Sequence, residues 1–432
     1  MIYNSAILKN EYKEELSNST GLNILRFIQM ALAFIVIAWL NLGVFTYVVP
    51  YIPNYIRWGL FLAWFCLALT SNKKFAKIFC IQCWPLLLFY FYMLFISFVI
   101  EKDLVVYIKS ISFLIVVYSI FLYYFDGTYK RFQKFLCAFL FLDCIAVGIN
   151  TYLQLQVNPM LARDLATGIE IRERLLGTAA FYGVGSYQYF YSLVSIILLL
   201  GFLFLNYPKK KFLALLLIFA FTGLLIRASF TMAILFTFSF LTLLIIIRYT
   251  NKYTFITVAL LGVLMLLIFQ GTFASMFGKL ADIEGIPYEV SVRFDELNLF
   301  FSGKKILGTD FEDRQNRYLQ SVDAFINNIL TGTVLNDSNK YSAGGHSAWF
   351  DLLATFGLFS IPFFIFLFKA YKYCKIRVPL TFRPFFKVYW LYYVCLGFVN
   401  TLLFVNIYTI WFLFLPLFIN SFFEKSEKSS VV

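Results

Sequence analysis

The chain's only histidine, His346, stands where a long polar stretch gives way to an apolar run. Flexible residues 336–345 precede it and Ser347 follows it, so the pair is expected to open a helix. Imidazole titrates near neutral pH, and the positive end of a helix disfavours its charged form. Asp351 suits the same dipole and can orient polar groups nearby. The pattern predicts a histidine able to accept a proton. The alternative is a polar residue at the membrane surface with no catalytic role.

Two arginines three residues apart, Arg314 and Arg317, begin the amphipathic stretch RQNRYLQSVDAFINNIL. Its apolar positions recur at three-to-four spacing and predict one stripe: Tyr318 or Leu319, Val322, Phe325 or Ile326, and Ile329. Both guanidinium groups share a side of this helix and can approach one anionic ligand. Because Asp310, Glu312 and Asp313 precede them, a helix start with acidic capping and local ion pairs is the alternative.

A third arginine, Arg227, lies in the segment FTGLLIRASFTMAILFTFSFL. This segment is too long for one membrane-crossing helix and too short for two full ones, so the chain is expected to turn near Arg227. With Ser229 and Thr231 following, Arg227 is expected to begin a helix, where unpaired amides and the helix dipole favour an anion. An arginine resting at the membrane interface is the alternative.

The elements that must position these residues are membrane helices. Hydrophobic residues make up 61% of the 432 residues and charged residues 14%, a balance that does not fit a soluble domain. A bilayer-spanning helix needs about 20 apolar residues, and such runs recur along most of the chain. We predict an all-α, polytopic membrane protein with about twelve spans, near 26–49, 54–70, 78–100, 104–125, 135–155, 188–206, 212–226, 229–247, 253–273, 348–368, 388–405 and 407–422.

Lysine and arginine gather in alternate connections, and positive residues are retained on the cytoplasmic side during insertion. This predicts that both termini are cytoplasmic. Residues 1–273 would hold nine spans with an external loop at about 156–187, residues 274–347 a large, partly helical external loop, and residues 348–432 three spans and a cytoplasmic tail. The net charge of +13 is explained by this topology and calls for no nucleic-acid partner.

The remaining composition gives little support to metal or disulfide chemistry. The seven cysteines fall within predicted spans or on the cytoplasmic side, where no disulfide framework is expected. With one histidine and no carboxylates at ligand-like spacing, we expect no metal site and no cofactor. Acidic and basic residues nearly balance over the large loop, so an anion site there must come from a few focused arginines.

Several features in this order resemble the O-antigen polymerase and ligase family, the Wzy-like polysaccharide enzymes of the bacterial envelope. They are the many spans, Arg227-Ala228-Ser229, the large late external loop, the stretch from Arg314 to Thr331-Gly332, and GGHSAWFDLLATFG. In the family, a histidine is followed by Asn or Ser and then by an apolar stretch and a glycine. This pattern matches His346, Ser347, Leu352, Leu353 and Gly357. The family's Asn-Pro-Leu-x-Gly-like turn reads Asn328-Ile329-Leu330-Thr331-Gly332 here, without the proline. The resemblance covers the second half of the chain by motif and the first half by topology.

The resemblance implies a metal-independent glycosyltransferase in the bacterial cytoplasmic (inner) membrane, with its site on the external face. Its substrates would be undecaprenyl-diphosphate-linked oligosaccharides, and its partners membrane lipid and a flippase and chain-length regulator of the same pathway. Arg314, followed by Arg227, Arg293 and Arg317, would bind the departing diphosphate, because a guanidinium holds phosphate oxygens with two hydrogen bonds. His346 would act as general base, with Ser347 and Asp351 in support.

Three other functions stay open at this stage. Serine after the histidine favours a polymerase over a ligase that transfers glycan to lipid A core. A lipid-linked oligosaccharide flippase or another carrier would also use many spans, although such carriers usually show two repeated halves, and no duplication is visible here. A non-catalytic envelope scaffold is the third reading. The sequence does not distinguish O-antigen from capsule or exopolysaccharide.

Overall fold

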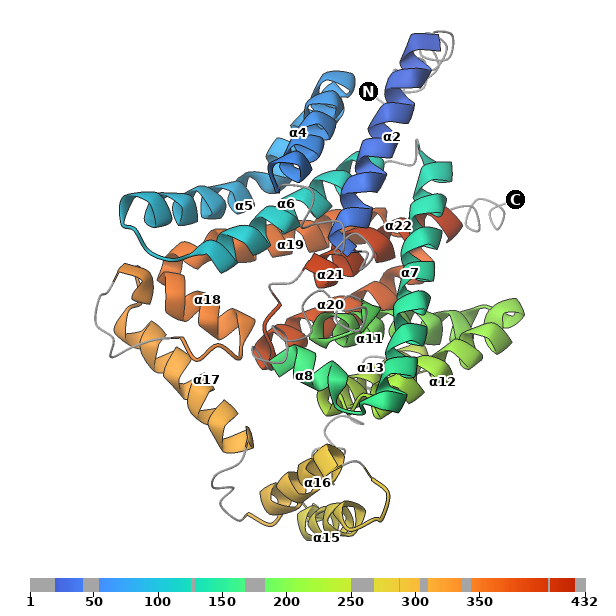
Figure 1. Cartoon of the computed structure of the whole chain (residues 1–432), viewed down its shortest axis with the longest axis vertical. Helices are drawn as coiled ribbons and strands as arrows, with labels where there is room; N and C mark the ends of the chain where they lie inside the picture. The colour runs from blue at the N-terminus through green and yellow to red at the C-terminus, as the bar shows by residue number, and fades with distance from the viewer. Residues whose placement is uncertain are drawn as a thin grey trace.

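In the computed structural model, every regular element is helical over the residues that the structure describes, which are 20–41, 54–125, 129–167, 183–249, 268–286, 288–303, 310–335, 343–402 and 405–423 (Figure 1). Within this part of the chain, seven helical segments are long and apolar enough to cross a membrane. The predicted all-α fold is therefore confirmed for these residues, and the length and composition of the seven segments support a membrane protein. Twelve spans remain a prediction, since most of the expected span 253–273 lies outside the described residues.

The long apolar segments coincide with the runs that the sequence indicates. They are α2 (Thr20–Asn41), α5 (Lys73–Val99), α6 (Val105–Tyr124), α7 (Lys130–Val157), α11 (Tyr187–Asn206), α13 (Thr231–Tyr249) and the joined pair α18 (Ala348–Phe356) and α19 (Ile361–Arg377). Shorter helices complete the bundle: α4 (Asn54–Ser71), α8 (Leu161–Thr167), α12 (Lys211–Arg227), α20 (Arg383–Val399), α21 (Val405–Tyr408) and α22 (Leu415–Phe423). A π-helical stretch, Thr409–Phe414, joins the last two.

Helix α11 lies at the centre of the bundle, and nearly all its side chains are buried. The Tyr392 hydroxyl of α20 donates a hydrogen bond of 2.8 Å to the carbonyl of Tyr191 on α11. Beside it, the rings of Tyr389 and Trp411 stack with centroids 3.9 Å apart, and the Tyr389 hydroxyl donates to the Trp411 carbonyl at 2.5 Å. Large aromatic rings thus fill the interior, and the hydroxyls of Tyr389 and Tyr392 find backbone carbonyls to donate to.

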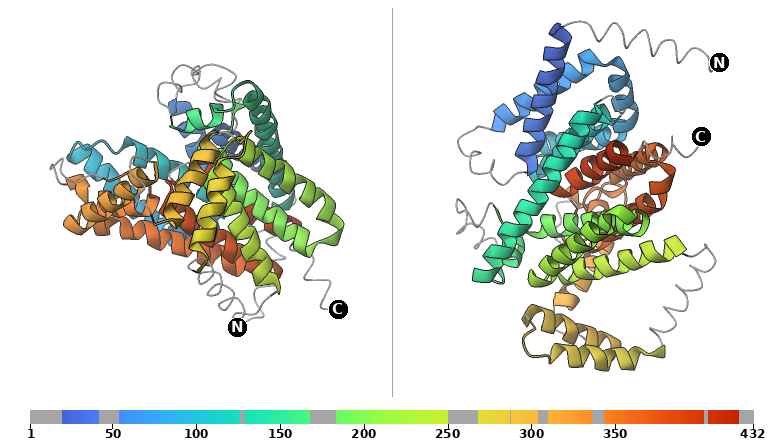
Figure 2. Two further views of the ribbon diagram at one scale, coloured as in Figure 1. Left: turned by 90° about the horizontal axis from the view of Figure 1, so that it is seen from below. Right: turned by 90° about the vertical axis from the view of Figure 1, so that its right-hand side faces the viewer.

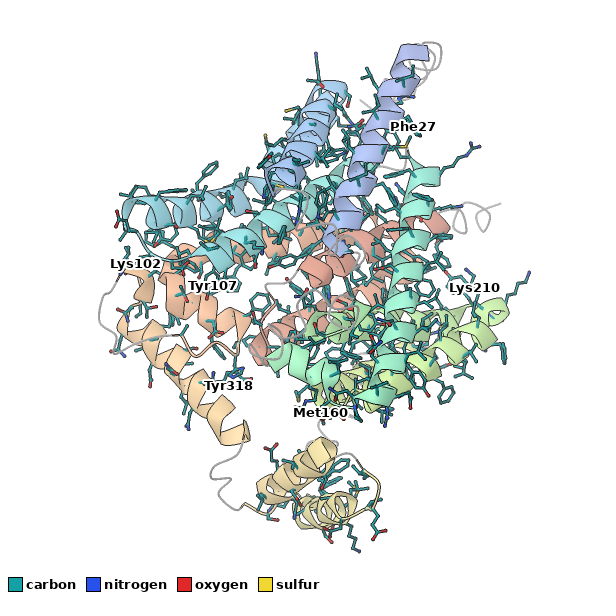
Figure 3. All side chains as sticks on the ribbon, viewed as in Figure 1. Phe27, Lys102, Tyr107, Met160, Lys210 and Tyr318 are labelled. Carbon is teal, nitrogen blue, oxygen red and sulfur yellow. The ribbon has the colours of Figure 1, made fainter. Side chains whose placement is uncertain are left out.

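The two ends of the bundle carry different connections (Figure 3). Lys102, between α5 and α6, lies at one end, and Lys210, between α11 and α12, lies at the opposite end. Helix α12 leads away from Lys210 and ends at Arg227, beside the last turn of α7. The predicted turn near Arg227 is confirmed, because α13 begins only four residues later, at Thr231. Helices α17 (Asp310–Asn327) and α18 lie at the Lys102 end.

The predicted large loop is helical in its described parts. Helices α15 (Gln270–Ala281) and α16 (Tyr288–Phe301) pack as a hairpin at one side of the bundle (Figures 1 and 2), with the rings of Phe277 and Phe301 stacked at 5.6 Å. Gly285, at φ 89°, lies in the turn between them, where glycine adopts a positive φ without strain.

The helix predicted for RQNRYLQSVDAFINNIL is confirmed as α17, and the half-buried side chains of Tyr318, Val322 and Phe325 lie on its predicted apolar stripe. Leu319, Ile326 and Ile329 are exposed, whereas Ser321 and Ala324 are buried. Small residues make the contact with α18 because they let the two helix backbones approach closely. Polar Ser321 is accepted at this contact because its hydroxyl is hydrogen-bonded.

The expected tenth span is not one straight helix. Helix α18 ends at Phe356, and its C-cap Gly357 combines φ 56° with ψ −140°, a conformation essentially restricted to glycine. A short 3₁₀ turn then leads to α19. Gly332, at φ 67°, follows α17 and packs against this break. The Leu358 amide donates to the carbonyls of Ile329 and Leu330 at 2.9 and 3.1 Å. The turn after α17 is thereby joined to the kink after α18.

Replacing Gly357 by alanine tests this junction. An alanine Cβ would lie 2.5–2.6 Å from backbone atoms of residues 329, 330 and 332, at a strained φ. We expect Gly357→Ala to lower the free energy of unfolding by roughly 2 kcal/mol or more. Thermal unfolding of the detergent-solubilised protein measures this. Gly271→Ala, in α15 with open space around it, is the control and should be neutral or slightly stabilising. Equal effects of the two substitutions would contradict the tight junction.

Candidate functional site

Ser347 caps the N-terminus of α18, as the sequence predicts for the residue after the histidine. Its hydroxyl accepts a hydrogen bond from the Phe350 amide at 3.3 Å and donates one to the Gly397 carbonyl of α20 at 3.2 Å. His346 is half-buried in the bend just before this cap. The cap therefore fixes the start of α18 against the end of α20, and with it the backbone on which the histidine sits.

The carboxylate of Asp351 gathers three donors from two parts of the chain. Its Oδ1 accepts from the Ser321 hydroxyl of α17 at 2.7 Å and from the Gly345 amide at 3.1 Å, and its Oδ2 accepts from the Ser347 amide at 3.0 Å. The side chain is only 7% exposed. Burying a carboxylate is unfavourable unless such bonds replace water, and the positive end of α18 assists. Asp351 thus ties the segment carrying His346 to α17.

Ser321 completes this connection from the α17 side. Besides donating to Asp351, its oxygen accepts from the Gly344 amide at 2.8 Å. Gly344 lies so close to α17 that a Cβ there would collide with the backbone of Arg317. The glycine is required by this close approach, and the GGHS sequence has a packing reason for its first residue. The four residues Gly344, Gly345, Ser321 and Asp351 are called the Asp351 clamp below.

The clamp brings two of the predicted site segments together. Arg317 is exposed on α17, and its backbone lies against Gly344. Gly344 comes two residues before His346 in the sequence. Arg314 lies one turn earlier on the same helix, and Arg293 lies in α16. The side chains of Arg314 and Arg293 lie outside what the structure describes, so their distances from His346 stay predictions.

Arg227 is at the end of a helix, and the prediction that it begins one is wrong. It is the last residue of α12, and Ser229, at φ 57°, makes the turn that leads into α13. Its Nη2 donates to the carbonyl of Leu155 in the last turn of α7 at 3.2 Å, while its buried Nε has no hydrogen-bond partner. A guanidinium at a helix C-terminus is attracted by the carbonyls there, which explains the position without an anion.

Sequence reasoning missed the contribution of α20 and the residues after it. The Tyr318 hydroxyl of α17 donates to the Val399 carbonyl at 3.1 Å, and the Ala348 amide of α18 donates to the Asn400 carbonyl at 3.2 Å. Tyr187, at the start of α11, reaches the Thr401 carbonyl at 3.3 Å. Residues 399–401 therefore join three helices at this end. A polar Asn-Thr pair between two apolar runs was the only signal of this in the sequence.

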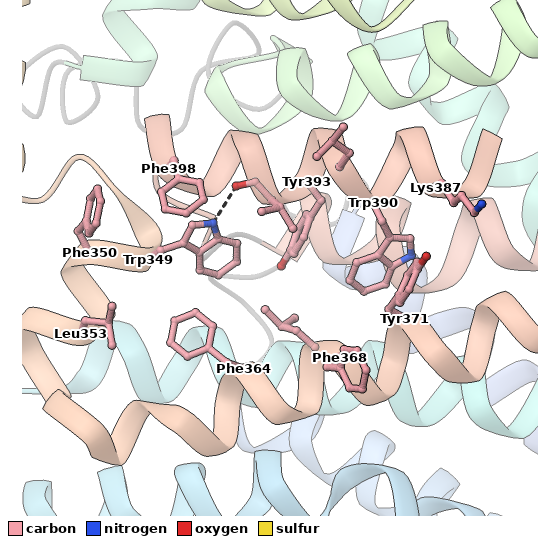
Figure 4. Close-up of a pocket in the computed structure, with 13 residues that line it drawn as sticks. Trp349, Phe350, Leu353, Phe364, Phe368, Tyr371, Lys387, Trp390, Tyr393 and Phe398 are labelled. Carbon is pink, nitrogen blue, oxygen red and sulfur yellow. Dashed lines mark hydrogen bonds between the residues drawn. The ribbon is translucent and has the colours of Figure 1, made fainter. Parts of the chain in front are cut away.

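An apolar groove of about 530 Å³ begins beside the start of α18 and runs between α19 and α20 (Figure 4). Trp349 and Phe350 line one end and Lys387 the other, with aromatic and aliphatic side chains between them. The Trp349 indole lies directly over Gly397, where a Cβ would overlap it, and its Nε1 donates to the Val394 carbonyl at 2.8 Å. The groove can hold a hydrocarbon chain whose polar end lies near His346.

The site therefore combines a histidine, arginines on an adjoining helix and an apolar groove. Such an arrangement can take a proton from a hydroxyl, bind an anion and hold a lipid chain. Over the described residues, no group of three or more His, Cys, Asp or Glu side chains is placed to hold a metal ion.

Comparison with known proteins adds no assignment. No family model matches the chain, and no curated protein sequence matches it.

Breaking the Asp351 clamp should loosen the segment of His346. Asp351→Asn places an amide against a cluster of backbone donors. We expect it to lower the free energy of local opening of this segment by about 1–3 kcal/mol. Hydrogen–deuterium exchange of residues 344–347 should become faster. Asp323→Asn, on the exposed side of α17, is the matched control and should leave exchange unchanged. Unaltered exchange in Asp351→Asn would show that the clamp does not hold this segment.

Proposed function

We propose that the protein is a polysaccharide polymerase, for O-antigen or capsule, that transfers a growing glycan from undecaprenyl diphosphate to a sugar hydroxyl of another lipid-linked repeat unit. The observation that carries the proposal is the Asp351 clamp, which holds the segment of His346 against the arginine-bearing helix α17. A transfer of this kind needs a base for the acceptor and positive charge for the departing diphosphate at one place.

In the proposed reaction, the acceptor hydroxyl gives its proton to the imidazole of His346 while its oxygen attacks the anomeric carbon of the donor glycan. The bond from that carbon to the diphosphate oxygen breaks, and the diphosphate leaves with the bonding electrons. Arg314 is the first candidate to stabilise the charge that develops there, with Arg317 one turn along the same helix. A general base of this type contributes about 10²–10⁴-fold to a rate.

Arg227 and Arg293 have secondary roles in this proposal. Arg227 already donates to the carbonyl of Leu155, which leaves Nε and the other terminal nitrogen for an anion at the α12–α13 turn. Arg293 belongs to the α15–α16 hairpin and would meet the substrate outside the bundle. Ser347 and Asp351 act by positioning, because their polar atoms are engaged with the backbone around His346.

Lipid-linked substrates also fit the shape of the site. The apolar groove beside Trp349 and Phe350 suits a prenyl chain whose diphosphate end points toward α17. We further propose twelve spans in the bacterial inner membrane, with both termini cytoplasmic and the Lys102 end external. The separation of Lys102 and Lys210 to opposite ends supports this, since the basic residues 209–211 are expected on the cytoplasmic side.

The decisive assay supplies purified protein with lipid-linked repeat units alone, in the presence of a chelator. We expect a ladder of longer lipid-linked glycans. Transfer that occurs only when lipid A core is added would assign a ligase instead. Movement of the lipid-linked unit across vesicle membranes without any transfer would assign a flippase. Either of these two results would contradict the polymerase proposal.

Replacing His346 by alanine removes the proposed base. We expect His346→Ala to lower polymer formation by about 10²–10⁴-fold while the protein still inserts into the membrane. Gel analysis of lipid-linked products, alongside the amount of protein in the membrane fraction, measures both. Wild-type rates at wild-type protein levels would exclude His346 as the base.

Replacing Arg314 by lysine keeps the charge but loses the planar pair of donors. We expect Arg314→Lys to slow polymer formation by roughly 10- to 100-fold. The matched control is Arg248→Lys, which should keep full activity. Arg248 is exposed in the last turn of α13, at the opposite end of that helix from the α12–α13 turn. If Arg314→Lys were as active as this control, bidentate phosphate binding by Arg314 would be ruled out.

A further inference from the structure

Asn400 occupies a central position beside the start of α18, although it lies far from His346 in the sequence. It follows the last residue of α20 in extended conformation, with φ −149° and ψ 163°. Its carbonyl accepts from the amide of Ala348, which is two residues after His346. Its own amide donates to the Leu396 carbonyl at 2.8 Å. The Asn400 backbone is thus fully engaged and held next to the candidate site.

The side chain of Asn400 is in the opposite situation. The residue is only 7% exposed, and its Nδ2 is buried without a hydrogen-bond partner. An amide donor shut away from water without a partner is unfavourable, so a ligand atom that accepts from it would stabilise it. Asn420, with the same type of side chain and 6% exposure, shows the usual solution, because its Nδ2 donates to the Phe125 carbonyl at 3.0 Å. Asn400 lacks such a partner at the place where substrate is expected.

We propose that Asn400 binds the acceptor substrate through this amide, which donates a hydrogen bond to the sugar hydroxyl oxygen that attacks. This inference rests on the proposed polymerase function. The hydroxyl gives its proton to His346 and uses a lone pair to accept from Asn400, so both residues act on one oxygen. As the proton leaves, the oxygen becomes more negative and the hydrogen bond from Asn400 strengthens, which favours the transition state over the bound acceptor.

A sugar hydroxyl fits Asn400 better than a phosphate oxygen does. The amide is neutral, whereas the charged donors suited to a diphosphate lie on α17 and at Arg227. The positive end of α18 lies beside the same position, capped by Ser347. A partial positive charge and a neutral donor suit an oxygen that gains negative charge only during the reaction.

The test replaces Asn400 by leucine, which has a similar shape and no donor. We expect kcat/KM for the acceptor to fall by about 10²–10³-fold. Binding of undecaprenyl diphosphate, measured with the purified protein, should be unchanged. The temperature of unfolding should stay the same or rise, because no hydrogen bond of the Asn400 side chain is lost. Asn400→Asp, which puts an acceptor where the donor was, should lose activity as well.

Asn420→Leu is the matched control. It removes a formed hydrogen bond to Phe125, so the temperature of unfolding should fall. The kcat/KM of the protein that remains folded should match the wild type. Comparing Asn400→Leu with Asn420→Leu therefore distinguishes a residue that binds substrate from one that stabilises the fold.

Three results would overturn the proposal. Wild-type kcat/KM in Asn400→Leu would show that the amide does not meet the acceptor. Weaker binding of undecaprenyl diphosphate would assign Asn400 to the donor side. A fall in the unfolding temperature as large as that of Asn420→Leu would assign it to the fold. A wild-type protein that makes no polymer in the same assay would instead reject the proposed function, and the role of Asn400 with it.

Discussion

The buried carboxylate of Asp351 is the contact on which the candidate site depends. Its two oxygens accept from the Ser321 hydroxyl and from two backbone amides flanking His346. A buried carboxylate is stable only when such donors surround it. The hydrogen bonds of the clamp are therefore cooperative, and the loss of one weakens the others. Through it, the short segment before α18 packs against α17. The segment of His346 therefore lies beside Arg317 of α17, although the two come from separate elements.

Two glycines let this contact form at close range. Gly344 passes against the backbone of Arg317, and Gly357 turns the chain sharply after α18 so that it meets Gly332. The break after α18 gives the short helix its own direction, which allows its N-terminus to lie between α17 and the end of α20. The apolar groove lies beside the same junction, because Trp349 of α18 contacts both Phe364 of α19 and Val394 of α20. The polar and apolar parts of the site are thus consequences of one junction.

Much of the fold could be predicted from the sequence, because bilayer thickness and periodicity constrain long apolar runs. The positions of α12, α13 and α17, the turn at Arg227 and the cap at Ser347 agree with simple rules. Other features depended on tertiary partners. The packed side of α17 uses Ser321 and Ala324, since close approach and hydrogen bonding outweigh apolarity there. The role of residues 399–401 could not be predicted, because only the spatial meeting of α11, α17 and α18 gives them partners.

The most direct test of the account is an experimental structure of the protein with an undecaprenyl-diphosphate-linked repeat unit bound. The account predicts that the diphosphate lies between Arg314 of α17 and the segment of His346, with the Asp351 clamp intact and the prenyl chain in the groove beside Trp349. A diphosphate bound at the Lys210 end, or in contact with only one of Arg314 and His346, would contradict it.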